Sequence, residues 1–211
     1  MKAVDGYKVE YKDLRKMGFD TDHDWIDPIL NTPLTKGEIG CFLSHWKAWK
    51  QCIKLNEPIL VLEDDAIVTE NFSYDELYKL RRQGYNFAYL GWMEMEESVP
   101  IDDKFVKPVY PYWGLAYVIT PESAKILTKG KPKIIPVDEY LPKMIEKLNV
   151  VAYKENVIIP RDRADGGSNI NPTSRYDYFV DFDTHVCTVA TDEAKADKLF
   201  TSAQKQGLKI D

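Results

Sequence analysis

The order of the elements predicted along the 211-residue chain indicates an α/β fold with a mostly parallel central sheet flanked by helices. Two observations support this prediction. Short, continuously apolar runs such as Ile59–Leu62 are typical of strands that are covered on both faces, as in parallel sheets. Between such runs lie helix-start motifs followed by apolar residues at helical spacing, the first of them at Thr35–Glu38. Strands and helices therefore alternate over most of the sequence.

The first part of the chain is predicted to contain one long helix. Residues 1–27 are polar and weakly periodic, with a short helix near Tyr11–Met17. Thr35–Glu38 is a capping box, in which a Thr hydroxyl and a Glu three residues later satisfy free amides. The helix that follows covers about residues 36–55, and Asn56–Pro58 ends it. Its apolar residues at helical spacing are Ile39, Phe42, Leu43, Trp46, Trp49 and Ile53.

The elements after Leu62 are predicted from the same signals. Ser73 and Glu76 form a second capping box, and Gly84 is the expected C-cap of that helix. Thr120 and Pro121 are an N-cap and a first-turn proline. An acidic loop is expected over residues 94–107. In order, we expect a helix over residues 73–83, strands at Phe87–Leu90 and Leu115–Ile119, helices over residues 120–130 and 137–148, and strands at Val150–Tyr153 and Val157–Ile159.

The last part of the chain has a different composition. Residues 161–175 are rich in Arg, Asp, Gly, Ser and Asn and are predicted to form a mobile loop. A strand at Thr184–Thr191, a helix at Glu193–Gln206 and the start of a strand from Leu208 follow. We therefore expect a main domain over residues 1–183 and a strand–helix–strand tail over residues 184–211.

Composition excludes several classes of protein. No apolar run approaches the roughly 18 residues of a membrane span, and residues 1–10 have no signal-peptide core. Cys41, Cys52 and Cys187 are odd in number and far apart, which favours a reducing, cytoplasmic location and gives no zinc-finger spacing. The net charge of −6 argues against nucleic acid as a partner. Five Trp, thirteen Tyr and eight Phe are compatible with a protein that handles sugars or bases.

Glu63, Asp64 and Asp65 are the sharpest chemical feature. Three adjacent carboxylates at the end of a buried strand repel one another unless a cation compensates them. Ligands of α/β sheets bind at the carboxyl ends of strands. Strand alternation would point Glu63 and Asp65 to one side and Asp64 to the other. Two carboxylates on one side can hold a hard divalent ion with positions open for phosphate oxygens. The alternative is a solvated strand end followed by a turn.

The segment from Leu34 to His45 (LTKGEIGCFLSH), followed by Trp49 and by Ile59–Asp65, resembles glycosyltransferase family 25. That family includes lipooligosaccharide and collagen galactosyltransferases. Its signature is a T-x-G-E-I-G-C-x-x-S-H helix before an L-E-D-D strand. Weaker matches occur in the family's order at Ala3–Gly6, Tyr89–Gly91, Gly114–Pro121, Pro136–Asp138 and Gly167–Ile170.

The resemblance implies a Rossmann-like GT-A fold, a nucleotide-sugar donor, usually a UDP-sugar, and Mn²⁺ or Mg²⁺. It makes Glu63, Asp64 and Asp65 the equivalent of the DxD motif. Asp65 would ligate the metal, with Glu63 as a second ligand. Glu63 or Asp64 would touch the ribose or a metal-bound water. The chemistry agrees, because a diphosphate leaving group gains charge in the transition state and a divalent ion neutralises it.

An inverting transferase also needs a general base for the acceptor hydroxyl. Asp138 and Glu139 follow a proline at the start of a predicted helix, and Asp138 matches the family's pattern. The alternative is that both carboxylates stabilise the helix macrodipole.

Other residues are candidates for binding the donor or the acceptor. Glu38 and His45 would line the site, or would be a capping residue and a buried, hydrogen-bonded His. Aromatic rings at Trp92, Tyr112 and Trp113 would stack on an acceptor sugar, or would pack in the core. A lid over the diphosphate would be formed by Arg161, Arg163 and Ser168, or these residues belong to a surface loop.

The chain departs from the family pattern at its start. The family opens with a strand–helix–strand unit before the segment that matches Ala3–Gly6. The tail has this missing pattern. If it completes the sheet, Thr188, Ala190 and Thr191 would contact the uridine. Otherwise it begins a further domain of a longer, multidomain chain.

The resemblance implies metal-dependent transfer of a hexose from a nucleoside-diphosphate sugar to a hydroxyl of a glycan acceptor, with inversion. Two alternatives remain open. One is a non-catalytic module that binds nucleotide-sugar or glycan. The other is a metal-dependent nucleotide-sugar hydrolase that uses Glu63–Asp65.

Overall fold

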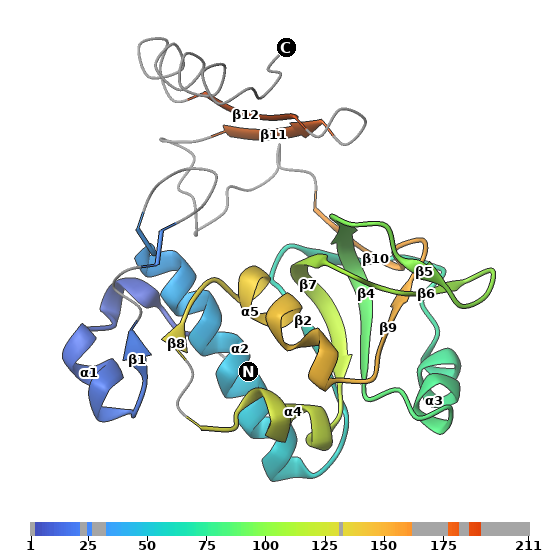
Figure 1. Cartoon of the computed structure of the whole chain (residues 1–211). Coiled ribbons are helices and arrows are strands. Elements are labelled where there is room, and N and C mark those ends of the chain that lie inside the picture. Colours follow the sequence, from blue (N-terminus) through green and yellow to red (C-terminus); the bar gives the residue numbers. More distant parts are fainter. Residues whose placement is uncertain are drawn as a thin grey trace. The chain divides into compact units, whose positions relative to one another are not determined.

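The computed structural model describes part of the chain in two compact units, residues Met1–Arg161 and Asp162–Asp211 (Figure 1). The described residues are 3–21, 25–26, 33–130, 133–161, 177–181 and 186–190.

The described strands of the second unit form one antiparallel pair, β11 (Asp177–Asp181) with β12 (Val186–Ala190). β12 confirms the middle of the strand expected at Thr184–Thr191, whose residues 184, 185 and 191 lie outside the described part of the chain. The helix expected over residues 193–206 lies outside the described residues. That residues 184–211 complete the main sheet stays a prediction.

The helices of the first unit agree closely with those expected. The long helix matches its expected bounds, and the short helix near Tyr11 is present. The helix expected over residues 137–148 is an α-helix followed by a 3₁₀ turn. The helical elements are η1 (Gly6–Lys8), α1 (Tyr11–Lys16), α2 (Lys36–Leu55), α3 (Tyr74–Arg82), α4 (Pro121–Leu127), α5 (Val137–Met144) and η2 (Ile145–Lys147).

The strands form one large sheet and two small pairs. The large sheet has six strands in the order β2-β7-β4-β9-β6-β5. Its members are β2 (Ile59–Leu62), β4 (Phe87–Glu94), β5 (Val99–Pro100), β6 (Phe105–Lys107), β7 (Pro111–Ile119) and β9 (Val150–Tyr153). The pairs are β1 (Asp20–Thr21) with β8 (Lys133–Ile134), and β3 (Ala66–Val68) with β10 (Ile158–Pro160).

The α/β class is confirmed, but the parallel character of the sheet is confirmed only in part. Only β4 and β9 pair in parallel within the six-stranded sheet, and its other pairs are antiparallel. Continuous apolar runs are typical of parallel strands, yet their physical cause is burial on both faces. An antiparallel strand that is covered on both faces produces the same run.

Two apolar layers cover the sheet. Phe87 and Tyr89 of β4 face one layer, which α2, α4 and α5 complete (Figure 1). Ala88 and Leu90 face the other, together with Leu80 of α3 and residues of β3 and β10. This alternation explains why the central strands are apolar at every position.

Local sequence signals determine where α2 begins and ends, and packing determines which of its faces is buried. The Thr35 hydroxyl accepts a hydrogen bond from the Glu38 N–H at 3.2 Å, and the Glu38 carboxylate accepts one from the Thr35 N–H at 2.6 Å. Asn56 ends the helix in the left-handed region, at φ 55°. Phe42 and Trp49 are fully buried and pack against the Tyr140 ring of α5.

The capping box expected for α3 does not form. Ser73 makes no side-chain cap. The Glu76 carboxylate instead pairs with Lys104 and accepts a hydrogen bond from the Tyr153 hydroxyl at 3.1 Å. The acidic loop expected over residues 94–107 also contains β5 and β6, which are too short to give a hydrophobic pattern.

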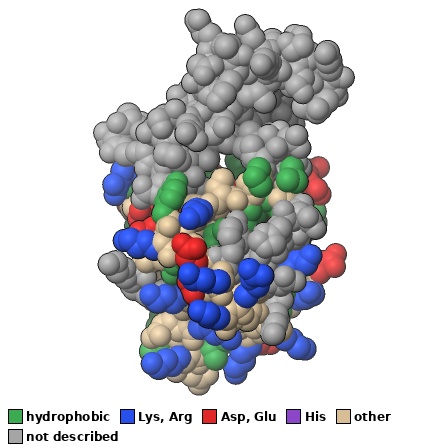
Figure 2. Space-filling model, turned by 90° about the vertical axis from the view of Figure 1, so that its left-hand side faces the viewer, with side chains coloured by type: hydrophobic (Ala, Val, Ile, Leu, Met, Phe, Trp, Pro, Cys, Tyr) green, Lys and Arg blue, Asp and Glu red, His purple; other side chains and the backbone are tan. Residues whose placement is uncertain are grey.

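Basic side chains outnumber acidic ones on the face shown in Figure 2. Exposed basic residues of α1 and α2 are Lys12, Arg15, Lys16, Lys36, Lys47, Lys50 and Lys54. Among the described residues, no helix is both long and apolar enough to cross a membrane.

A close contact between two glycines holds the N-terminal segment against α2. A Cβ atom on Gly40 would lie 2.7 Å from the backbone nitrogen of Gly6, closer than real Cβ atoms approach. The neighbouring Val4 N–H donates a hydrogen bond to the Ser44 hydroxyl at 2.8 Å. The position of Gly40 therefore requires glycine because of space, although it lies inside a helix.

We predict that Gly40→Ala destabilises the protein. Helix propensity alone would stabilise it by about 1 kcal/mol. The clash with Gly6 should instead lower the free energy of unfolding by about 1–3 kcal/mol. Denaturant unfolding measures the change. Gly114→Ala is the matched control, because the nearest heavy atoms to its added Cβ would lie at 3.5 Å, an ordinary van der Waals distance. A Gly40→Ala protein that is as stable as the wild type would contradict this packing.

Candidate functional site

Glu63 lies where β2 ends and a turn begins. Its N–H donates to the Leu115 carbonyl of β7 at 2.9 Å, and its own carbonyl accepts from the Ala66 N–H at 3.2 Å. Its side chain is 28% exposed, whereas Asp64 and Asp65 are exposed. The strand alternation expected through residue 65 is therefore wrong, because β2 stops at Leu62 and the chain turns towards β3.

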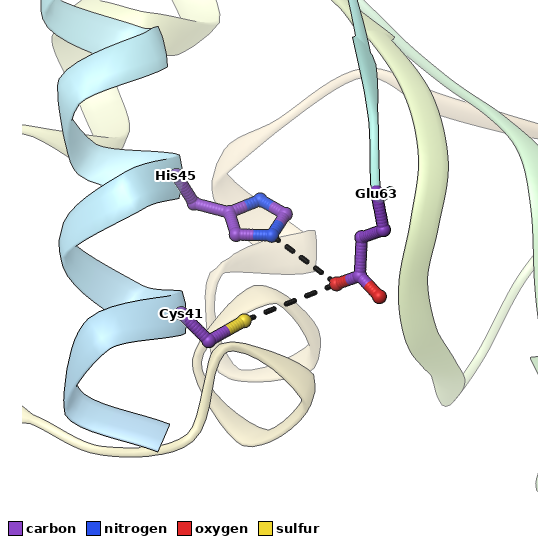
Figure 3. Close-up of side chains that lie close together, drawn as sticks. All are labelled: Cys41, His45 and Glu63. Carbon is purple, nitrogen blue, oxygen red and sulfur yellow. Dashed lines mark hydrogen bonds and ion pairs between the residues drawn. The ribbon is translucent and has the colours of Figure 1, made fainter. Parts of the chain in front are cut away.

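Two side chains of α2 point at the Glu63 carboxylate (Figure 3). His45 Nε2 is 3.3 Å from Glu63 Oε1, and Cys41 Sγ is 3.9 Å from the same oxygen. Cys41 and His45 are four residues apart and share one face of the helix. The sulfur, nitrogen and oxygen atoms of the three residues lie within 4.8 Å of one another.

A buried hydrogen-bond chain sets the orientation of the His45 ring. The Trp49 indole N–H donates to the Tyr117 hydroxyl oxygen at 2.8 Å, and this oxygen lies 2.7 Å from His45 Nδ1. Tyr117 is fully buried. Its oxygen accepts from Trp49, so its own proton is best directed at Nδ1. The ring proton of His45 then lies on Nε2, which donates to Glu63.

Asp138 reaches the same region from the first turn of α5. Its Oδ1 accepts a hydrogen bond from the Gly114 N–H of β7 at 2.8 Å. Trp113, the residue before Gly114, has φ 72°, and the pairing of β4 with β7 shifts register between Gly91 and Met93. A bulky residue in this conformation is strained, and such strain is often found at functional sites.

The environment of Asp138 favours its protonated form. Burial, followed by the negative charge of Glu63, raises the pKa of Asp138 to about 7, although the Gly114 N–H and His45 oppose the shift. Burial is also the main cause that raises the pKa of the Cys41 thiol, followed by the charges of Glu63, Asp138 and Glu38. Several negative groups therefore act on one small region.

Asp65 interacts with this region through its charge. Partial burial and then the charge of Glu63 raise the pKa of Asp65, and Arg161 opposes the shift. The Arg161 N–H also donates to the Asp65 carbonyl at 2.7 Å. The charge of Glu63 therefore acts on both Asp65 and Asp138.

Other predicted residues have contacts that fit the structural alternatives. Glu38 caps α2. Glu139 accepts from the Tyr110 hydroxyl at 3.2 Å and pairs with Lys143. Trp92 is 6% exposed and donates its indole N–H to the Tyr153 carbonyl, which favours the core role over acceptor stacking.

The remaining predicted residues divide into three groups. Tyr112 and Trp113 are partly exposed and stay candidates for the acceptor site. Thr188 and Ala190 lie in β12 of the second unit, where only the backbone is described. Residues that lie outside the described part of the chain are Arg163, Ser168 and Thr191.

Cys41 and Tyr117 were not predicted as site residues. The four-residue spacing of Cys41 and His45 on one helix could have indicated Cys41. Nothing local indicates Tyr117, because its role depends on the pairing of β2 with β7 and on the position of α2.

Comparison with known proteins supports the resemblance seen in the sequence. A model of glycosyltransferase family 25 (LPS biosynthesis protein) matches residues 1–141. A protein of Anopheles gambiae named Glycosyltransferase 25 family member is 40% identical over 155 residues, which cover 68% of this chain and 26% of that protein. Procollagen galactosyltransferase 2 of Homo sapiens is 37% identical over 169 residues, covering 74% and 27% of the two chains.

The chain spans about a quarter of the length of these two relatives. A solved structure of apo-UDP-glucose pyrophosphorylase aligns with 97% of this chain and 77% of that one, at 10% identity and a TM-score of 0.41.

We predict that Asp138→Asn stabilises the protein at neutral and higher pH. The unfolded Asp has a pKa near 3.9, whereas the pKa of the folded Asp138 is about 7. Between these values the folded state holds a proton that the unfolded state has lost, so stability falls as pH rises through this window. The Asn side chain still accepts from Gly114 but carries no charge.

The difference in the free energy of unfolding between Asp138→Asn and the wild type should grow with pH, to on the order of 2 kcal/mol. Thermal melts with a chelator at about pH 5 and about pH 8 measure it. If Asp138 instead serves the macrodipole of α5, Asp138→Asn would melt lower than the wild type. Glu70→Gln, an exposed carboxylate elsewhere, is the control.

Proposed function

The chain belongs to glycosyltransferase family 25, and on this premise we propose that it is a glycosyltransferase that moves a hexose from a UDP-sugar to a hydroxyl of a glycan acceptor. The proposed reaction is metal-dependent and inverts the anomeric carbon. Relatives named procollagen galactosyltransferase make galactose the first sugar to test.

The observation that carries this proposal is the pair of carboxylates in unlike environments. Glu63 is held by His45 at 3.3 Å, while Asp138 has its pKa raised to about 7 by burial and by the charge of Glu63. A general base works best when its pKa lies near the working pH. Two carboxylates whose environments separate their roles are a recurring arrangement in acid–base catalysis.

In the proposed step, Asp138 takes the proton of the acceptor hydroxyl. The acceptor oxygen forms a bond to the anomeric carbon of the donor sugar, and the bond from this carbon to the diphosphate oxygen breaks. The nucleoside diphosphate leaves with the electron pair. Gly114 holds Asp138 through its N–H, so the base is positioned before the acceptor arrives.

The oxygen donors of Glu63 and Asp65 suit Mn²⁺ or Mg²⁺. The charge of Glu63 raises the pKa of Asp65, and this repulsion is what a bound cation would relieve. Bound there, the ion would supply neutralising charge for the diphosphate. A UDP-sugar and a divalent ion are therefore the cofactors of this proposal. Asp64, which is exposed beside them, is proposed to contact the ribose or a metal-bound water.

A cytoplasmic location is also part of the proposal. The support is the pattern of cysteines: Cys41 and Cys52 are free thiols.

Two rival functions predict different outcomes. A non-catalytic module would bind nucleotide-sugar without turnover, and a hydrolase would cleave it at the same rate with or without a glycan.

We predict that Asp138→Asn lowers kcat by about 100-fold or more, because the acceptor hydroxyl loses its base. Asp65→Asn should lower kcat/KM by at least about 10-fold and raise the Mn²⁺ concentration needed for half-maximal rate. Release of UDP from UDP-galactose, with and without a glycan acceptor, measures both. Glu70→Gln is the control, since its carboxylate is exposed and lies outside the site. Full activity in both variants would overturn the assignment.

The rate should also depend on pH with a defined sign. Asp138 acts as a base only when ionised, so kcat/KM should rise with pH and then level off. Mn²⁺ bound to Glu63 offsets the charge that helps to raise the pKa of Asp138, so at saturating Mn²⁺ the midpoint should lie below about 7. A profile measured at saturating Mn²⁺ that is flat from about pH 4 to about pH 8 would contradict the role of Asp138 as the base.

A further inference from the structure

Cys41, His45 and Glu63 offer three different ligand atoms in one small space (Figure 3). The sulfur, ring nitrogen and carboxylate oxygen lie within 4.8 Å of one another. Cys41 and His45 come from adjacent turns of α2, and Glu63 comes from the end of β2. The atoms face one another across the space between helix and strand, so a single ion can reach all three after small side-chain movements.

The chemistry of these atoms selects a particular class of ion. Thiolate and imidazole ligands favour Zn²⁺, Co²⁺ and related ions over Mg²⁺ and Mn²⁺, which prefer oxygen. A site with one Cys, one His and one carboxylate leaves a fourth tetrahedral position open. It differs in kind from the Glu63–Asp65 oxygen pair, although Glu63 belongs to both.

The surroundings hold His45 in the orientation that such a site needs. Its Nδ1 is hydrogen-bonded to the Tyr117 hydroxyl at 2.7 Å, and Tyr117 accepts from Trp49 at 2.8 Å. A metal-binding His is usually fixed in this way through its other ring nitrogen. When Nε2 binds an ion, the ring proton moves to Nδ1 and is donated to the second lone pair of the Tyr117 oxygen, and the Tyr117 O–H proton turns away from Nδ1.

The electrostatic environment also favours a cation. The negative charges of Glu63, Asp138 and Glu38 all act on Cys41. These charges attract a divalent ion, and a thiol that coordinates such an ion loses its proton.

We propose that Cys41, His45 and Glu63 form a binding site for Zn²⁺ or a similar borderline-soft divalent ion, and that its occupation inhibits the transferase. Binding forms bonds from the metal to Sγ, Nε2 and a Glu63 oxygen, and the thiol proton passes to solvent. Glu63 is then no longer free to hold the catalytic ion. The binding part stands on geometry alone, whereas the inhibition rests on the proposed function.

Cobalt(II) titration of the full chain tests the binding part. Wild-type protein should show one equivalent of Co²⁺ with the near-ultraviolet absorption of a cobalt–thiolate bond and the visible bands of tetrahedral cobalt. Cys41→Ser should lose the thiolate band and bind Zn²⁺ at least about 100-fold more weakly in competition with a chromophoric chelator, because even loss of a supporting hydrogen bond costs about 10- to 100-fold.

Cys52→Ala is the matched control. Cys52 is another cysteine of α2, but its sulfur contacts the carbonyls of Glu57 and Ile119 instead. It should bind Co²⁺ as the wild type does. His45→Gln is a second test variant and should also bind more weakly. Circular dichroism melts establish that each variant is folded. A thiolate band that persists in Cys41→Ser, or a wild type that binds Zn²⁺ no more tightly than Cys41→Ser, would overturn the site.

Inhibition is measured separately, at saturating Mn²⁺ with added Zn²⁺, each protein being compared with its own zinc-free rate. The wild type and Cys52→Ala should lose activity at Zn²⁺ concentrations that Cys41→Ser tolerates. Equal sensitivity of all three overturns the inhibitory role. Absence of transfer with any donor sugar overturns the proposed function, while the cobalt titration still decides the metal site.

Discussion

The buried hydrogen bonds from Trp49 to Tyr117, from Tyr117 to His45 and from His45 to Glu63 connect α2, β7 and the end of β2. Each of these groups is polar, and all except Glu63 are buried, so leaving any of them unpaired would cost free energy of folding. These hydrogen bonds therefore fix the position of α2 relative to β7 and to the end of β2. Because Glu63 is its last member, the same interactions that satisfy the core also orient the carboxylate at the surface.

Unlike these hydrogen-bonded groups, Asp138 lies where its charged form is disfavoured. Its carboxylate is held by Gly114 in a region where burial and Glu63 disfavour its charge, and the backbone before Gly114 is strained at Trp113. The proposed base with a pKa near neutrality would account for an ionisable group in this position, since stability is commonly lost where catalytic groups are placed. Glu63 connects these features, because it is held by His45, acts on Asp138 and Asp65, and lies beside Cys41.

The sequence predicted the fold well wherever the signal was local. The capping box at Thr35, the stop at Asn56 and the proline at position 121 mark helices that the structure contains. The box at Ser73 failed because Glu76 pairs with Lys104 and Tyr153, which are distant in sequence. Strand direction could not be predicted, because burial on both faces produces the same apolar run in parallel and antiparallel sheets.

For the site, the sequence by itself determined which residue types are present and their family resemblance: the carboxylates from Glu63 to Asp65, Asp138 before its helix, and His45 within the α2 motif. Only the tertiary structure decided which of these meet. It placed Cys41 and Tyr117 beside His45, buried Trp92 in the core, and ended β2 before the acidic turn. The reason is that the contacts of His45 are distant in sequence. Glu63 at the end of β2 is 18 residues away and Tyr117 on β7 is 72 residues away, so they meet His45 only when the sheet and its covering helices pack.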